Sequence, residues 1–212
     1  KGASTLLRTH DAVVRAMPFT LLREVQLDAS LELQAEKMLA IRELGYGTNA
    51  KMMVGFSSRP WYGLGSNGAS YSDLPHHQAT WETNPINGTA TRGILTDYSS
   101  GTRGANLKSG NVQAEASRFL QDLDLVYPGA LVAATVQNHK YVAFLEHWPS
   151  NPLAKGSYTC YTPGQFTTIA GNEGKSVGHL YFAGQHANSF YVWQGFMEGA
   201  CLSGIDAAHE IL

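Results

Sequence analysis

The C-terminal segment, residues 179–212, constrains the fold more than any other stretch of this sequence. A short apolar run, Leu180 to Ala183, is followed by Gly184, a loop and a longer periodic pattern that begins at about Phe196. In that pattern, small and apolar residues recur at i, i+3, i+4 and i+7 spacing: Met197, Ala200, Cys201, Gly204, Ala207, Ala208 and Ile211. The segment therefore predicts a buried strand, a tight turn and a helix that packs closely through this face.

Upstream of this segment, apolar runs alternate with turn residues and predict more strands than helices. Strands are expected at 12–16, 51–56, 94–98 and 140–146, and helices at 31–44 and 112–126. Ser30 and Asn111 are expected to cap the two helices, which Gly45 and Pro128 end. Residues 63–93 are rich in Gly, Ser, Asn and Thr, so hairpins and long loops are expected there.

The composition excludes several classes of function. The 212 residues carry a net charge of −2 and are 43% hydrophobic, which allows a core but gives no positive field for nucleic acid or an anionic membrane surface. The sequence shows no motif for a membrane-spanning helix, a metal site, a catalytic triad or a carboxylate dyad. Cys160 and Cys201 are predicted to be reduced thiols. We expect a soluble chain, with the cytoplasm favoured.

One motif that suggests a nucleotide site is better explained as a turn. Gly63, Gly65 and Gly68 have the spacing of a dinucleotide-binding loop. That loop works only between a strand and a helix, because the helix N-terminus must meet a pyrophosphate. Pro60 precedes the motif and Pro75 follows it closely, so neither a strand before it nor a helix after it is expected.

The C-terminal segment resembles the flavin-binding segment of the FAD-dependent amine oxidases, which include monoamine, polyamine and L-amino-acid oxidases. The resemblance rests on Phe182-Ala-Gly-Gln-His186, Gly195-Phe-Met-Glu-Gly-Ala200, Ser203-Gly204 and Ala207-Ala208, which occur in the family's order. It implies FAD contacts at Gly184, Gln185, His186, Gly195, Phe196, Met197 and Ala200. Gln185 stands where many members have Glu, and it can still accept a hydrogen bond from a ribityl hydroxyl. His179 is a further candidate for a polar flavin contact.

The middle of the chain extends the resemblance. Leu44-Gly-Tyr-Gly47 and Ala50-Lys51 follow the family's order, which implies that Lys51 lies near flavin N5 through a water and acts in catalysis as a nearby positive charge. Without that context, Lys51 is a surface lysine at a strand end. Because no family fingerprint for the adenosine part of FAD occurs in residues 1–212, we interpret the chain as the C-terminal part of a larger enzyme whose N-terminal half is a missing partner.

The segment around Trp148 and Tyr158 also resembles the family and implies contacts of both residues with the flavin. Tyr158 and Phe196 match two aromatic positions that flank the substrate amine in monoamine oxidases. The alternative is that both are ordinary core aromatics. Ser157 stands where monoamine oxidases carry the cysteine that bonds to the flavin, so non-covalent FAD is expected.

The resemblance implies a mixed α/β fold and an oxidase activity. Residues 28–151 are expected to form a substrate-binding domain with a mixed sheet and flanking helices, and residues 1–27 and 152–212 part of a Rossmann-like FAD-binding domain. The incomplete parallel sheet would expose an edge that favours homo-oligomers. The expected reaction converts an amine to an imine and reduces O2 to H2O2.

The substrate and the reaction class leave alternatives open. An aromatic or small primary amine is favoured by the aromatic-rich middle of the chain. For an amino-acid substrate, Arg59, Arg92 and Arg103 are candidate partners of the carboxylate. Another flavoprotein of the superfamily, such as a desaturase, an isomerase or a mutase, and a non-catalytic binding domain are the other interpretations.

Overall fold

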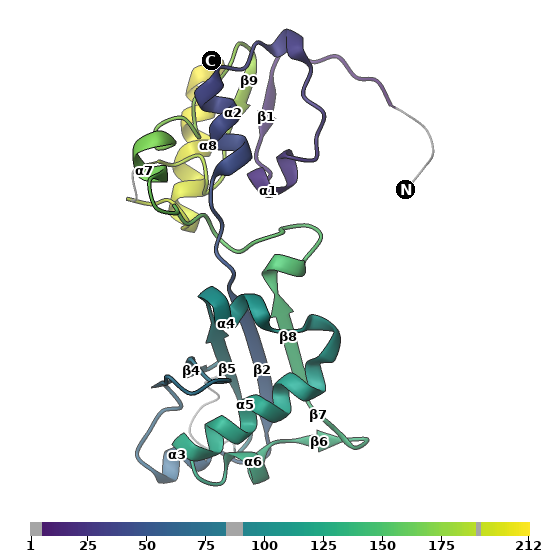
Figure 1. The fold of residues 1–212 in the computed structure, drawn as a ribbon, viewed down its shortest axis with the longest axis vertical. Helices are drawn as coiled ribbons and strands as arrows, with labels where there is room; N and C mark the ends of the chain where they lie inside the picture. The colour runs from purple at the N-terminus through teal and green to yellow at the C-terminus, as the bar shows by residue number, and fades with distance from the viewer. Residues whose placement is uncertain (1–5, 84–90, 190–191) are drawn as a thin grey trace. The chain divides into compact units, whose positions relative to one another are not determined.

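The computed structural model describes residues 6–83, 91–189 and 192–212, and the chain divides into two compact units (Figure 1). The first unit contains the chain up to residue 46 together with residues 158–212, and the second contains residues 47–157. Residues 28–46, which the sequence analysis placed in the substrate-binding domain, therefore belong to the first unit. Whether the units are a FAD-binding and a substrate-binding domain stays a prediction.

The first unit is built on two parallel strands. In chain order its elements are β1 (Val13–Arg15), α1 (Phe19–Leu22), the 3-10 turn η1 (Ala29–Leu31), α2 (Ala35–Glu43), α7 (Gln165–Thr168), β9 (Leu180–Phe182) and α8 (Met197–Ile211). Val13 pairs with Leu180 and Arg15 with Phe182. The predicted strands at both ends of the chain are thus confirmed, and they lie side by side although far apart in sequence.

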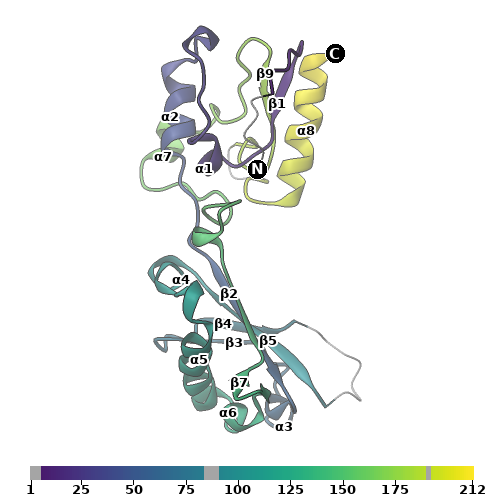
Figure 2. The ribbon, with the colours of Figure 1, turned by 90° about the vertical axis from the view of Figure 1, so that its right-hand side faces the viewer.

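Two helices cover the opposite faces of this strand pair (Figure 2). Leu180 and Phe182 of β9 pack in one apolar cluster with Ile41 of α2. Tyr181, which points to the other face, packs in a second cluster with Ala207 of α8. The alternation of β9 side chains between two helices explains why all three residues of this strand are buried.

The helix predicted at 31–44 begins later than expected. Ser30 lies in η1, where its backbone N–H donates to the Asp28 carboxylate at 2.9 Å. Because this side-chain bond and the left-handed Glu32 (φ 48°) end the first turn, α2 starts only at Ala35. The end at Gly45 is as predicted. A Cβ at Gly45 would lie 2.2 Å from the Cys160 carbonyl oxygen, so close packing requires glycine there.

The face of α8 that packs inward was predicted incorrectly. Its buried residues are Gly199, Ser203 and Ala207, at i, i+4 and i+8. Of the predicted stripe, Ala207 is buried, whereas Met197, Cys201, Gly204, Ala208 and Ile211 are exposed. The reason is that polar Ser203 makes an inward hydrogen bond, described below, which a pattern of apolar residues does not register.

The second unit is a five-stranded antiparallel sheet with a helix on one face. Its elements are β2 (Ala50–Phe56), α3 (Pro60–Gly63), β3 (Ser70–Tyr71), β4 (Ala79–Glu82), β5 (Gly93–Ser99), α4 (Gly101–Asn106), η2 (Ser109–Asn111), α5 (Val112–Val126), α6 (Ala130–Ala133), β6 (Val136–Gln137), β7 (Lys140–Tyr141), β8 (Ala143–His147) and η3 (Trp148–Ser150). The strand order is β3-β4-β5-β2-β8. The mixed α/β class is confirmed, with a parallel pair of strands in the first unit. The mixed sheet expected in the second unit was wrong, because all its described strand pairs are antiparallel.

The core of the second unit lies between the sheet and α5. Every second residue of β2, such as Met52 and Val54, is buried against α5 residues that include Phe119, Leu120 and Leu123. Because side chains alternate along a strand, Lys51 points to the opposite face of the sheet. On this face, the alternate residues of β2 (Lys51, Met53 and Gly55) are partly buried.

The start of α5, the strand predicted at 140–146 and the glycine motif at 63–68 agree only in part with the sequence predictions. Asn111 precedes α5, but its side chain makes no capping hydrogen bond. The strand predicted at 140–146 is divided at Val142, whose N–H donates to the Thr135 carbonyl at 2.9 Å. The motif at 63–68 is a turn, as predicted, because α3 ends at Gly63 and Gly65 and Gly68 have positive φ angles of 75° and 87°.

Candidate functional site

The turn that follows β9 is fixed by hydrogen bonds between Gly184 and Ser203 of α8. Gly184 has a φ of 113°, a conformation that favours glycine. Ser203 Oγ lies 2.9 Å from both the N–H and the carbonyl oxygen of Gly184. A Cβ at Gly184 would lie 2.7 Å from His186 Cε1. The predicted contact residue Gly184 is thus fixed in place, and Ser203 is a positioning residue that the sequence indicated only as part of a motif.

Gln185 connects two segments that the sequence analysis had selected separately. Its side-chain oxygen accepts hydrogen bonds from the hydroxyl of Thr159 at 2.7 Å and from the N–H of Thr159 at 3.3 Å. Its backbone carbonyl accepts from Gly195 N–H at 3.3 Å. A Cβ at Gly195 would lie 3.5 Å from Tyr158 Cδ2. Tyr158, Gln185 and Gly195 are therefore brought together.

His186 is placed in the apolar core. Only 1% of it is exposed, and its ring lies edge-on to Phe19 with 4.5 Å between centroids. Its Nε2 has no hydrogen-bond partner among the described residues. Burial, and then the positive charge of Lys37, lower its pKa to about 4. His186 is thus a neutral side chain at physiological pH. His179, the other candidate, is exposed at the start of β9.

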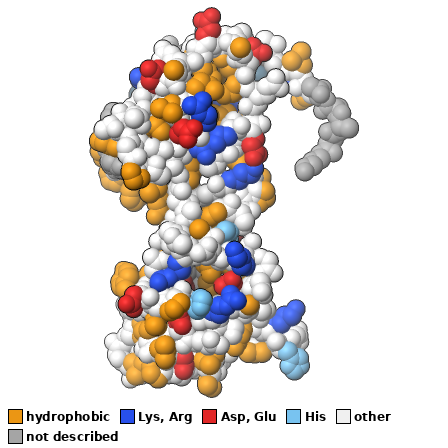
Figure 3. Space-filling model, in the orientation of Figure 1, with side chains coloured by type: hydrophobic (Ala, Val, Ile, Leu, Met, Phe, Trp, Pro, Cys, Tyr) orange, Lys and Arg blue, Asp and Glu red, His pale blue; other side chains and the backbone are white. Residues whose placement is uncertain are grey.

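The first turn of α8 is open to a ligand. Phe196 is the N-cap residue, and no side chain among the described residues caps the helix. The first N–H groups of a helix lack partners within the helix, so those at Met197 and its neighbours offer donors and a partial positive charge. Apolar side chains reach the surface of this unit (Figure 3). Among them, Phe196 is 60% and Met197 88% exposed, while Ala200 is partly buried.

The remaining predicted residues belong to the second unit. Lys51 pairs with Tyr98 and with Glu146 in the sheet register, and its Nζ lies 5.9 Å from the centre of the Trp81 ring. It is partly buried on the face opposite α5. Trp148 begins η3 and is partly buried, and its carbonyl accepts from two backbone N–H groups, at 3.1 Å each.

The three arginines considered for a substrate carboxylate differ in their surroundings. Arg59 is buried and forms an ion pair with Glu82 at 2.7 Å. Arg103 donates to two backbone carbonyls, at 3.0 and 3.3 Å. Arg92 lines a cavity of about 340 Å³ together with Ile94 and other residues of the second unit. Arg103 also lines a cavity, of about 490 Å³, but its guanidinium group already donates to the two carbonyls, so Arg92 is kept as the candidate partner of an anionic ligand.

A Ser-His-Asp arrangement that the sequence analysis did not anticipate occurs in the second unit. Ser70 Oγ lies 2.9 Å from His77 Nε2, and His77 Nδ1 lies 2.8 Å from Asp97 Oδ1. However, the hydroxyl of Thr80 donates to the Gly68 carbonyl, so the 2.5 Å contact between Ser70 and Thr80 must use the Ser70 proton. A nucleophilic serine would give that proton to His77. His77 is also fully buried, so the cluster is not a hydrolase site. Its hydrogen bonds instead link β3, β4 and β5.

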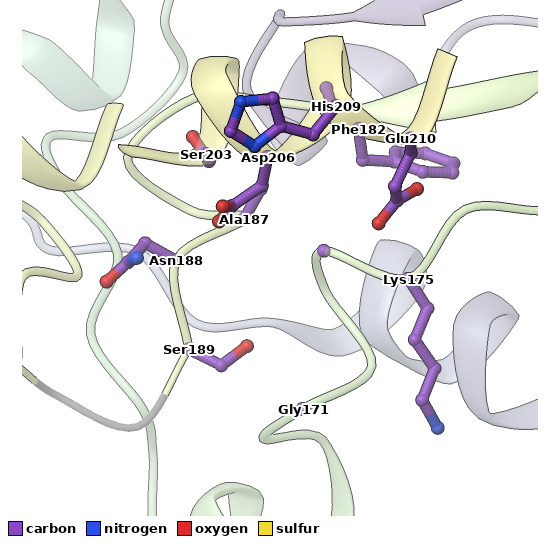
Figure 4. Close-up of a pocket in the computed structure, with 12 residues that line it drawn as sticks. Gly171, Lys175, Phe182, Ala187, Asn188, Ser189, Ser203, Asp206, His209 and Glu210 are labelled. Carbon is purple, nitrogen blue, oxygen red and sulfur yellow. The ribbon is translucent and has the colours of Figure 1, made fainter. Parts of the chain in front are cut away.

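A cavity of about 560 Å³ in the first unit lies along α8 rather than at its start (Figure 4). Ser203, Asp206 and Glu210 of α8 border it on one side, and the loops around Lys175 and Asn188 on the other. None of the residues predicted to contact the flavin is among those that line it. This cavity is therefore separate from the group formed by Tyr158, Gln185 and Gly195.

Two simpler expectations concern the whole described chain. Cys160 and Cys201 are both exposed and unpaired, which fits the prediction of reduced thiols. Within residues 6–83, 91–189 and 192–212, no helix has the length and apolar character needed to cross a membrane.

Comparison with known proteins places this geometry in context. A family model described as flavin containing amine oxidoreductase matches residues 1–212. The chain is 28% identical over 204 residues to a putative L-amino-acid oxidase of Bacillus subtilis, covering 96% of this chain and 41% of that protein. It is 24% identical to an L-amino-acid oxidase of Pseudechis australis, covering 84% and 34%.

Solved structures share the fold. Cyclohexylamine oxidase from Brevibacterium oxydans superposes with a TM-score of 0.75 at 21% identity, and wild-type putrescine oxidase bound to putrescine with a TM-score of 0.73 at 17% identity. Each similarity covers 94% of this chain and 42% of the solved chain. The present chain thus spans about two fifths of the length of the first relatives and structures that it matches.

Proposed function

Because the chain belongs to the family of flavin-containing amine oxidoreductases, we propose that it is the C-terminal part of an enzyme that uses FAD to oxidise an amine. The products would be an imine and, after transfer of the electrons to O2, hydrogen peroxide. The observation that carries this proposal is the uncapped N-terminus of α8, held beside Tyr158 and Gln185. The N-terminal half of the same enzyme, outside this sequence, would supply the dinucleotide-binding loop.

The residues present fit the flavin end of FAD. Bound FAD would accept the hydride equivalent from the carbon that bears the amine nitrogen, so the protein has only to bind, orient and tune the cofactor. The first-turn N–H groups of α8, beginning with Met197, would donate to the edge of the ring that becomes negative on reduction. Gly184 and Gly195 would allow the backbone to approach the cofactor closely.

The binding of FAD is proposed to be non-covalent. The hydroxyl of Ser157, which stands at the position of the bonding cysteine in monoamine oxidases, donates to the side chain of Asn49. Ser157 has no sulfur and so cannot form a thioether, and its hydroxyl has a structural partner instead. Release of the flavin on denaturation with acid would support this proposal, whereas flavin that stays with the precipitated protein would contradict it.

Lys51 and the aromatic residues are proposed to act on the substrate side. Lys51 would hold a positive charge and a proton near flavin N5, and Tyr158 and Phe196 would flank the approaching amine with aromatic faces. The sheet face that carries Lys51 also presents Trp81 and Tyr98, whose ring centres are 5.7 Å apart. This face favours an aromatic or small primary amine.

A second candidate substrate is an L-amino acid, because two relatives carry that name and Arg92 lines a cavity. The two classes are distinguished by peroxide release from the full-length protein with a panel of primary amines and L-amino acids. Arg92→Ala should raise KM for an amino acid and leave the KM of a primary amine unchanged.

The decisive experiment measures the flavin spectrum and peroxide release of the full-length protein. Lys51→Met should slow flavin reduction or reoxidation on the order of 10²-fold, in the range typical of proton-transfer groups. Lys140→Met is the matched control, because Lys140 is exposed on β7 of the same unit. A flavin-free full-length protein, or no peroxide with any amine, would overturn the proposed function.

A further inference from the structure

A buried carboxylate in the first unit, that of Glu173, accepts hydrogen bonds from three side chains. Glu173 is fully buried in a loop between α7 and β9. Its Oε2 accepts from the hydroxyl of Ser189 at 2.6 Å, and its Oε1 accepts from Gln194 Nε2 at 3.2 Å and from the hydroxyl of Tyr161. Three side-chain donors therefore meet at this one buried carboxylate, which links three segments of the unit.

The backbone around Glu173 is fixed as well. Lys37 of α2 is buried, and its ammonium group donates to the Glu173 carbonyl at 2.7 Å while lying 3.7 Å above the centre of the Phe182 ring. A Cβ at Gly174 would lie 2.5 Å from the Ala187 carbonyl oxygen, so this loop touches the loop after β9 directly. The carboxylate is thus attached to the core and not to a free surface loop.

The three segments that Glu173 anchors are those that carry the proposed flavin contacts. Ser189 follows β9 and the turn at Gly184. Gln194 immediately precedes Gly195, Phe196 and the first turn of α8. Tyr161 ends the segment that contains Tyr158 and Thr159. A single side chain therefore sets the position of both ends of the loop before α8.

We propose that Glu173 is a positioning residue that holds the loop before α8 and so aims the first-turn N–H groups of this helix at the flavin. The inference rests on the proposed function, and it assigns a role to a residue outside the predicted flavin contacts. When the carboxylate bonds are lost, the N–H donors lose their direction and stabilise the reduced flavin less well.

Loss of the Glu173 charge and loss of its positioning role would change the flavin midpoint potential in opposite directions, so an experiment can separate them. Removing a negative charge near the flavin would favour the anionic reduced form and raise the midpoint potential. Loss of positioning would lower it. Glu173→Gln changes both, whereas Ser189→Ala removes one hydrogen bond without changing any charge. The small Ser189 variant also keeps the test open if Glu173→Gln does not fold.

The experiment measures the flavin midpoint potential of the full-length holoenzyme by spectroelectrochemistry. We expect Glu173→Gln to lower the equilibrium constant for two-electron reduction about tenfold, which lowers the midpoint potential by about 30 mV. Ser189→Ala should lower the midpoint potential by a smaller amount. Glu115→Gln is the control, because Glu115 is also a buried carboxylate but lies in the second unit, bonded to Arg118 at 3.1 Å. An unchanged potential in both loop variants, or a rise in Glu173→Gln alone, would overturn the positioning role.

Hydrogen exchange of the flavin-free protein provides a second readout. Gly195 N–H donates to the Gln185 carbonyl and Ala200 N–H to the Phe196 carbonyl, each at 3.3 Å. Both amides should exchange faster in Glu173→Gln and Ser189→Ala but not in Glu115→Gln. If the wild type bound no flavin, the proposed function and the role of Glu173 toward flavin would both fail, while faster exchange would still show that Glu173 orders this loop.

Discussion

The two units of the chain neutralise their buried charges differently. In the second unit, Arg59 forms an ion pair with Glu82 at 2.7 Å, and both side chains are buried. In the first unit, the Lys37 ammonium donates to a backbone carbonyl rather than to a carboxylate. Its pKa falls to about 7, chiefly because burial penalises the charged form, although the charge of Glu173 opposes the shift.

This difference implies that the two units respond differently to pH. A buried ion pair is satisfied by its partner, whereas a buried cation bonded only to neutral groups destabilises the fold until it loses its proton. We therefore expect the first unit to carry most of the pH dependence of stability. Hydrogen exchange read by mass spectrometry can follow peptides of each unit separately and so test this comparison.

The largest effect is expected at Lys37. Its pKa is about 7 in the folded chain and 10.5 in the unfolded chain, so the unfolded state binds more protons between these values, and stability rises with pH across this window. Relative to Lys37→Met, the wild type should gain up to about 5 kcal/mol between pH 7 and pH 10.5. The gain should appear in peptides of the first unit. Equal pH profiles for the two proteins would contradict the assignment.

A core truncation in the second unit should produce the opposite pattern. Leu120 is fully buried between α5 and the sheet. Leu120→Ala should lower the free energy of unfolding of this unit by about 3 kcal/mol at every pH, because the lost contacts and the cavity do not titrate. Exposed Leu125 of the same helix is the control, and Leu125→Ala should cost far less. If peptides of both units lost protection equally, the two units would not be independent in stability.

The contrast between the units also shows what the sequence can predict. Short apolar runs bounded by turn residues located β2 and β5, and helical spacing located α5 and α8, although the buried face of α8 differs from the predicted one. The resemblance in the C-terminal segment selected Gln185 and Gly195, which the structure brings together with Tyr158. Both kinds of prediction depend on local patterns or on motifs with a fixed order, and the flavin contacts themselves stay a prediction.

The features that the sequence did not reveal depend on pairs far apart in the chain. Lys37 and the carbonyl of Glu173 are separated by 136 positions, and nothing in the helical pattern marks Lys37 as buried. The hydrogen bonds of Ser70, His77 and Asp97 likewise form only when three strands come together. Such polar networks have no periodic signature, because each donor is placed by tertiary packing rather than by its neighbours in sequence.

A smaller pH effect is expected at His186. Its pKa is about 4 in the folded chain and 6.5 in the unfolded chain, so its stabilising contribution is complete above pH 6.5 and is lost as the pH falls towards 4. The loss amounts to about 3 kcal/mol. In His186→Leu, this part of the acid dependence should disappear from the peptides of the first unit. Acid unfolding of equal steepness in the variant would show that another group is responsible.

The smallest effects on stability are expected from glycine-to-alanine substitutions in α8 of the first unit, where close packing and helix propensity act in opposite directions. A Cβ at Gly199 would lie 2.1 Å from the Trp193 carbonyl oxygen, whereas a Cβ at Gly204 would meet no atom within 4 Å. Gly199→Ala should therefore destabilise the first unit by about 2 kcal/mol through overpacking. Gly204→Ala should stabilise it by up to about 1 kcal/mol, because alanine is the better helix former. Thermal unfolding of both variants measures the two signs. Equal effects at the two glycines would mean that the contact of α8 with the preceding loop does not restrain this helix, and the proposed role of that loop would lose its physical basis.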